Sequence, residues 1–122
     1  MPNKRSSILV VEDDADLQEA MAELLQEHGF AVLVASNGRE GLAKLREHSG
    51  VRAILLDVEM PVMCGATFRG EQQEDPAIAS VPLVVLTGRE DYVPLARSMS
   101  ADAWVQKPFT PEALLRVVDR YR

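Results

Sequence analysis

Short, continuous apolar runs alternate along the chain with segments in which apolar residues recur at helical spacing. The continuous runs are typical of strands buried on both faces, and the recurring pattern is typical of amphipathic helices. The five predicted strands cover residues 7–11, 30–35, 53–56, 83–86 and 103–105. Because a helix follows each strand, the pattern predicts a parallel sheet joined by right-handed helical crossovers and covered on both sides.

Three of the five predicted helices begin at clear capping signals. A polar N-cap side chain satisfies backbone N–H groups that a helix leaves unpaired at its start, and glycine favours its end. Proline is well tolerated as the first helical residue. These signals predict helices after Asp14, ending at His28 and Gly29; after Asn37, with Glu40 third in the helix and an end near His48; and after Thr110, with Pro111 first and an end at the chain terminus.

The other two predicted helices have less regular patterns. One follows a loop at 57–65 and starts near Ala66, and the Asp75-Pro76 pair obscures its end. The other follows the fourth strand and runs to about Met99. We expect Pro94 to interrupt it, because proline inside a helix removes a backbone hydrogen bond.

Polar residues that can carry chemistry follow four of the five strands. In an open parallel sheet, ligands bind at the carboxyl ends of the strands, where the strand order reverses. The second strand ends in Ala35-Ser36, with nothing ionisable, so a strand order of 2-1-3-4-5 would leave it at the edge and gather the other four. The gathered residues are Glu12, Asp13 and Asp14 after the first strand, Asp57 after the third, Thr87 after the fourth and Lys107 after the fifth.

Several carboxylates at one edge of a sheet require compensation. Two of them about 4 Å apart repel by roughly 1 kcal/mol in water and about 4 kcal/mol at the effective dielectric near a protein surface. A divalent cation removes this repulsion, and hard oxygen ligands suit Mg²⁺. With a hydroxyl from Thr87 and an ammonium from Lys107, such a site has what phosphoryl transfer needs, and Asp57 is the natural acceptor because it stands alone in its segment.

Composition and charge narrow the function classes further. The chain has 122 residues, a formal net charge of −6 and no Lys/Arg-rich run, which argues against nucleic-acid or anionic-membrane binding. We expect one domain over residues 1–122, with no membrane-spanning or signal segment. The single cysteine, Cys64, excludes an intrachain disulfide and favours the cytoplasm; we expect it to be a small packed side chain.

Four motifs together carry a family resemblance. They are residues 10–14 (VVEDD), 55–65 (LLDVEMPVMCG), 86–88 (LTG) and 104–109 (WVQKPF). In this order and at these separations they resemble the receiver domain of bacterial two-component response regulators, the CheY-like superfamily, over essentially the whole chain. The resemblance implies an α/β fold of the flavodoxin-like type, a doubly wound (βα)5 three-layer sandwich, and here a receiver that stands alone.

The resemblance also implies a metal site and a phosphoacceptor. Asp57 would accept the phosphoryl group and, with Asp13, bind Mg²⁺ directly, with Mn²⁺ as a possible substitute. Glu12 would act through water, and Glu59 would offer its backbone carbonyl to the metal. The phosphoryl donor would be a histidine kinase or a histidine phosphotransfer protein. The chain would be no enzyme beyond its own phosphotransfer and autodephosphorylation.

A conformational switch is implied as well. Lys107, with a cis bond to Pro108, would pair with the phosphoryl group, and Thr87 would move inward to hydrogen-bond it. Trp104 matches the switch aromatic of the family, although it is larger than the usual Tyr or Phe, and we expect it to be half exposed. The changed face, formed by the fourth helix, the fifth strand and the last helix, would bind an output protein, with the receiver a monomer or weak dimer.

Two other functions share parts of this pattern. A haloacid-dehalogenase-type phosphatase also uses a strand-end Asp with Mg²⁺, but it places its nucleophile on the first strand. A degenerate receiver that serves only as an interaction module is the other alternative. We also hypothesise that Glu59 pairs with Arg89 and limits access of water to the acceptor.

Overall fold

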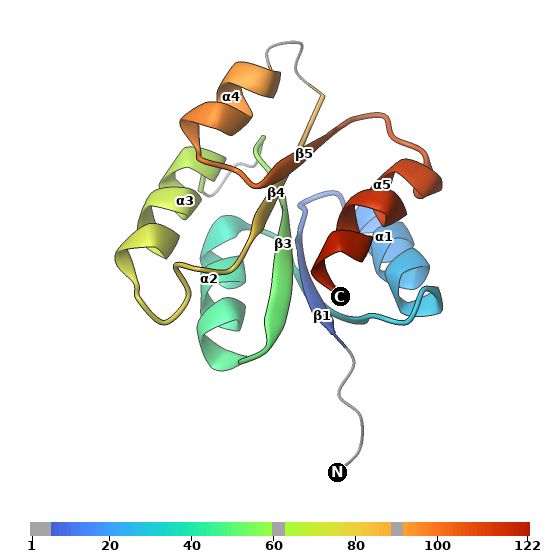
Figure 1. Cartoon of the computed structure of the whole chain (residues 1–122), viewed down its shortest axis with the longest axis horizontal. Helices are drawn as coiled ribbons and strands as arrows, with labels where there is room; N and C mark the ends of the chain where they lie inside the picture. The colour runs from blue at the N-terminus through green and yellow to red at the C-terminus, as the bar shows by residue number, and fades with distance from the viewer. Residues whose placement is uncertain (1–5, 60–62, 89–91) are drawn as a thin grey trace.

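The computed structural model describes residues 6–59, 63–88 and 92–122 and contains one parallel five-stranded sheet (Figure 1). Its strand order is β2-β1-β3-β4-β5, which confirms the predicted order 2-1-3-4-5 and the doubly wound α/β class. All four strand pairs are parallel. The strands are β1 (Ser7–Val11), β2 (Ala31–Ala35), β3 (Val51–Asp57), β4 (Leu83–Thr87) and β5 (Ala103–Gln106).

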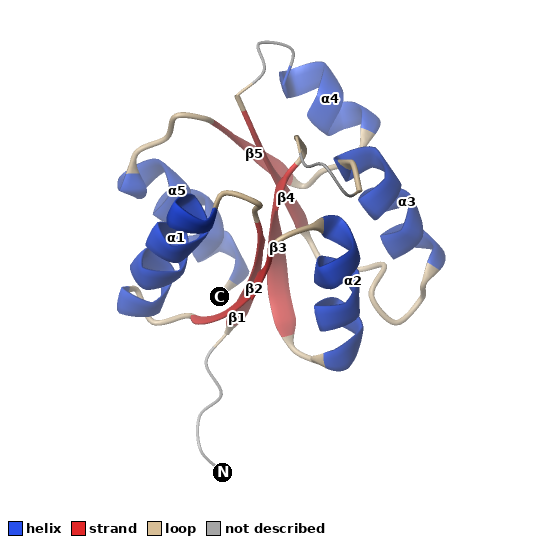
Figure 2. Cartoon of the chain, turned by 180° about the vertical axis from the view of Figure 1, so that it is seen from behind, coloured by secondary structure: helices blue, strands red, loops and turns tan. Residues whose placement is uncertain are grey.

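Helices cover both faces of the sheet in three layers. Helices α1 and α5 lie together on one face, and α2, α3 and α4 lie on the other, as the two opposite views show (Figures 1 and 2). No helix in the described part of the chain is long and apolar enough to cross a membrane. The helices are α1 (Ala15–Glu27), α2 (Gly38–Glu47), α3 (Gly65–Glu74), α4 (Tyr92–Ser98) and α5 (Pro111–Val118), followed by a 3₁₀ turn at Asp119–Tyr121.

Alternate residues of each strand supply two separate cores. Leu9, Val11 and Leu56 pack on the side of α2 and α3, while Ile8 and Val10 pack on the side of α1 and α5. All five are fully buried. Successive strand residues point to opposite faces, so a sheet covered on both sides needs apolar residues at every position. This is the physical origin of the continuous apolar runs in the sequence.

The predicted N-caps are confirmed. The Asp14 carboxylate accepts hydrogen bonds from the N–H groups of Asp16 and Leu17 at 3.0 and 3.2 Å. The Asn37 side chain accepts one from the Glu40 N–H at 2.8 Å. The Thr110 hydroxyl accepts one from Ala113 at 3.1 Å. These contacts satisfy donors that a helix leaves free in its first turn.

Three local expectations are wrong. Strand β3 starts at Val51 rather than at residue 53, although it ends at Asp57 as expected. Pro94 does not interrupt α4: it is the third helical residue, where no N–H is needed for an intrahelical bond. Cys64 is exposed rather than packed, because it is the N-cap of α3 and lies outside the core.

A buried polar network attaches α3 to its neighbours. The Arg69 guanidinium, 8% exposed, donates to the carbonyls of Met99 and Ser100 and to the side chain of Gln72, at 2.7–2.9 Å. Gln72, fully buried, donates to the carbonyls of Ile78 and Val81 at 3.0 and 2.9 Å. Arg69 therefore holds the chain that follows α4, and Gln72 holds the loop that leads into β4.

Replacing Arg69 with Met should lower the free energy of unfolding by about 2–4 kcal/mol, because it leaves buried carbonyls without their donors. Urea denaturation measures this change. Glu71→Ala, on the exposed face of the same helix, is the matched control and should change stability by less than about 0.5 kcal/mol. Equal stability of the two variants would contradict a structural role for the network.

Candidate functional site

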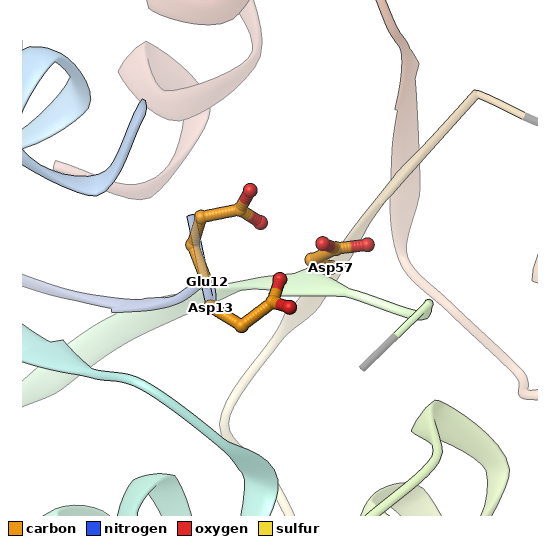
Figure 3. Close-up of side chains that lie close together, drawn as sticks. All are labelled: Glu12, Asp13 and Asp57. Carbon is orange, nitrogen blue, oxygen red and sulfur yellow. The ribbon is translucent and has the colours of Figure 1, made fainter. Parts of the chain in front are cut away.

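Three carboxyl groups meet at the carboxyl ends of the central strands. Glu12 and Asp13 follow β1, and Asp57 is the last residue of β3. One oxygen from each lies within 4.8 Å of the others, and the close-up shows the side chains pointing toward a common space (Figure 3). Glu12 is 1% and Asp57 4% exposed, whereas Asp13 is exposed. The cluster therefore has a buried floor and opens to solvent at Asp13.

Strand register and a glutamine hold the floor in place. Val11 of β1 pairs with Leu56 of β3, so the residues that follow each, Glu12 and Asp57, come side by side. The Gln18 amide donates to the carbonyls of Glu12 and Ala35, each at 3.0 Å. Sequence analysis missed this role of Gln18, because a glutamine in the first turns of a helix has no pattern that marks a contact with strand ends.

Lys107 joins the cluster from β5. Its Nζ lies 3.2 Å from Glu12 Oε1, 3.3 Å from Glu12 Oε2 and 3.3 Å from Asp57 Oδ2. Its backbone N–H donates to the Thr87 carbonyl at 2.8 Å, and its bond to Pro108 is cis, as expected. One ammonium therefore bridges two carboxyl groups that belong to different strands.

The charges in this cluster do not balance. Burial, and then the hydrogen bond and charge of Asp57, raise the pKa of Glu12 from 4.5 to about 8, although Lys107 acts in the opposite direction. Burial alone would lower the pKa of Lys107, but the charges of Asp57 and Glu12 outweigh it and raise that pKa. The ammonium can neutralise only one of three carboxyl groups, so the site favours either a proton on Glu12 or a further cation.

Glu59 links Thr87, the predicted switch residue, to the predicted acceptor Asp57. The Thr87 side chain is fully buried, and its hydroxyl donates to Glu59 Oε1 at 3.1 Å. The Glu59 backbone N–H donates to Asp57 Oδ1 at 2.9 Å. The sequence led us to expect that the Glu59 carbonyl binds the metal and that its side chain pairs with Arg89, so the contact of this side chain with Thr87 was not predicted. The predicted partner Arg89 lies outside the described residues, as do Met60, Pro61 and Val62 of the quoted motif.

Trp104 lies on the outer strand of the sheet, one strand beyond Thr87. It is 38% exposed, in agreement with the expectation of a half-exposed aromatic side chain. It pairs in register with Val85 of β4, two residues before Thr87. The same edge is hollowed beside α5, where Trp104, Gln106, Thr110, Ala113 and Arg116 contribute to the lining.

The acidic cluster fits a hard divalent cation. Glu12, Asp13 and Asp57 supply carboxylate oxygens, the ligand type that Mg²⁺ prefers, and their excess negative charge favours such an ion. The opening at exposed Asp13 allows the ion to retain water, as Mg²⁺ commonly does in proteins.

Comparison with known proteins identifies the family to which this chain belongs. The sequence profile of the response regulator receiver domain matches residues 8–119. The chain belongs to the response regulator receiver family. Among curated relatives of this receiver, the transcriptional regulatory protein CpxR homolog of Haemophilus influenzae is 36% identical over 112 residues, which are 90% of this chain and 47% of the relative. The receiver thus spans about half the length of most of the first curated relatives that it matches.

Solved structures of the same family superpose closely on the receiver. Chemotaxis response regulator CheY4 of Vibrio cholerae is 30% identical with a TM-score of 0.88, covering 98% of this chain and 100% of that one. TrrA from Thermotoga maritima, solved in complex with Mg²⁺-BeF, is 31% identical with a TM-score of 0.84, covering 96% and 99%. The fold neighbours therefore support the flavodoxin-like architecture along nearly the whole receiver.

Because Glu12 holds a proton up to about pH 8, Mg²⁺ binding to the receiver should release protons. The apparent affinity should rise up to about tenfold per pH unit between pH 6 and pH 8 and level off above. Titration calorimetry in buffers of different ionisation enthalpy measures this release. Glu12→Gln should make the Mg²⁺ affinity nearly independent of pH. If the wild-type affinity were equally independent of pH, Glu12 would not be the group that loses a proton when the metal binds.

Proposed function

We propose that this receiver is a phosphorylation-dependent signalling switch in which Asp57 accepts a phosphoryl group in the presence of Mg²⁺. The observation that carries the proposal is the placement of Asp57: buried, 3.3 Å from the Lys107 ammonium, and joined by Glu12 and Asp13 in a cluster that fits a divalent cation. The related TrrA was solved with Mg²⁺-BeF, and this supports the choice of ion. Mn²⁺ offers the same charge and accepts similar oxygen ligands.

The donor is a phosphohistidine on a histidine kinase or a histidine phosphotransfer protein. An Asp57 carboxylate oxygen attacks the phosphorus, the P–N bond breaks, and the histidine nitrogen keeps the electron pair and gains a proton. An acyl phosphate forms on Asp57. The metal ion supplies charge neutralisation, and Lys107 supplies a second positive charge next to Asp57 Oδ2. The hydrogen bond from the Glu59 N–H fixes Asp57 Oδ1 and so orients the carboxylate.

Phosphorylation then changes a face that binds an output protein. We assign this face to α4, β5 and α5, because Thr87 ends the strand beside β5 and Trp104 is exposed on β5 itself. The acyl phosphate carries a charge of about −1.5 to −2 in place of the single negative charge of the Asp57 carboxylate, and the Thr87 hydroxyl turns toward it. The receiver acts in the cytoplasm as a monomer or weak dimer, and catalyses only its own phosphotransfer and dephosphorylation.

Acetyl phosphate should add one phosphoryl group to the receiver, measured by intact-protein mass spectrometry, only when Mg²⁺ is present. Asp57→Asn should abolish the addition, and Lys107→Ala should slow it at least about tenfold, because it removes the charge beside Asp57 Oδ2. Asp75→Asn, which changes a carboxylate paired with Arg46 away from the cluster, is the matched control and should react normally. Phosphorylation of Asp57→Asn, or equal reaction without Mg²⁺, would contradict the proposal.

Trp104 is the single tryptophan of the chain, so it reports on this site without labelling. Its fluorescence should change when Mg²⁺ is added, because the ion changes the charge near the end of β5. It should change again when acetyl phosphate is added, because the Thr87 side chain turns toward the phosphoryl group. The second change should be absent in Asp57→Asn. A flat response to both additions would count against a functional site beside this strand.

A further inference from the structure

Glu59 contacts the two residues on which the switch depends. Its backbone N–H donates a hydrogen bond to Asp57 Oδ1 at 2.9 Å, and its side-chain Oε1 accepts a hydrogen bond from the Thr87 hydroxyl at 3.1 Å. Thr87 is fully buried at the end of β4, whereas Glu59 is exposed. The exposed glutamate therefore reaches inward to a buried hydroxyl from the loop that follows the acceptor.

A threonine hydroxyl has one proton and donates one hydrogen bond at a time. While that proton points at the Glu59 carboxylate, it is not available to a phosphoryl oxygen on Asp57. The two acceptors therefore compete for the same donor. In the unphosphorylated receiver the structure shows the donor bonded to Glu59.

Phosphorylation changes the terms of this competition. It replaces the single negative charge of the Asp57 carboxylate with a phosphoryl group of charge about −1.5 to −2, on a residue that the Glu59 N–H already contacts. Because like charges repel, the new charge on Asp57 disfavours the Glu59 carboxylate as the acceptor of the Thr87 hydrogen bond. The phosphoryl oxygens, in contrast, are strong acceptors for the same hydroxyl. Glu59 is exposed and can move to solvent without leaving a buried charge.

We propose that the Glu59 side chain is a latch: it holds the Thr87 hydroxyl in the unphosphorylated receiver and so opposes the switch until Asp57 is phosphorylated. This inference rests on the proposed function and adds a regulator of the same site. Glu59 is a positioning residue, since it acts through Thr87. The latch sets how strongly the receiver favours its unphosphorylated conformation.

Two substitutions separate the hydrogen bond from the charge. Glu59→Gln removes the charge but keeps an oxygen that accepts the Thr87 proton, whereas Glu59→Ala removes both. Binding of beryllofluoride, a phosphoryl mimic, is measured by titration calorimetry at saturating Mg²⁺. We expect Glu59→Ala to bind it about three- to tenfold more tightly than Glu59→Gln, the ratio that one net hydrogen bond supplies.

The Ala and Gln variants at Glu59 are then compared in receivers that also carry a substitution at Thr87. This shows whether their difference in beryllofluoride affinity depends on the Thr87 hydroxyl. In Thr87→Val, which has a similar shape but no hydroxyl, the Ala and Gln variants at Glu59 should bind beryllofluoride equally. In Thr87→Ser, which keeps the hydroxyl, the ratio between them should return. A general effect of Glu59 on loop structure would persist in Thr87→Val, and this persistence would overturn the latch.

The wild-type titration separates failure of the latch from failure of the proposed function. If the wild-type receiver does not bind beryllofluoride with Mg²⁺, while circular dichroism shows it folded, both the phosphorylation function and the latch are wrong. If it binds, and Ala and Gln at Glu59 give equal affinity, the function stands and the latch is wrong.

Discussion

An excess of negative charge at the carboxyl edge of the sheet is the constraint on which the site depends. Glu12 and Asp57 are nearly inaccessible to solvent, and Lys107 bridges them at 3.2–3.3 Å. Charges in such a position cannot rely on water for stabilisation, so they need a proton, a lysine or a metal ion. Burial and the neighbouring Asp57 raise the pKa of Glu12, although Lys107 acts in the opposite direction. This imbalance favours the binding of a cation beside Asp57.

The chain before α4 and the chain after it are held by different contacts. At the carboxyl edge, Thr87 is bonded to Glu59, an exposed side chain that can leave. Beyond the other end of α4, the carbonyls of Met99 and Ser100 are bonded to buried Arg69. A buried guanidinium with three hydrogen bonds is costly to displace, since each carbonyl would lose its donor. The fold thus combines a replaceable contact near the acceptor with a firm attachment at the far side of α4.

The family match covers a receiver domain, whereas many of the curated relatives are longer. The receiver profile spans residues 8–119, nearly the whole of this chain. The curated regulators that match it are often about twice as long. Within the described residues, Trp104 is exposed on β5 beside a hollow next to α5, in the face that we propose binds an output partner.

The strands, the helix caps and the members of the acidic cluster could be predicted from the residues alone, and the strand order from the residues together with the family resemblance. Strands buried on both faces must be apolar throughout. The polar residues that follow them lie at one edge of the sheet, because parallel strands all end at the same edge. Other contacts are visible only in the folded molecule, because local residue patterns do not encode them. Contacts such as Gln18 to the β1 and β2 ends, Arg69 to Ser100, and Glu59 to Thr87 join residues distant in sequence. They depend on the direction in which a side chain points after folding, and residue type and periodicity leave that direction open.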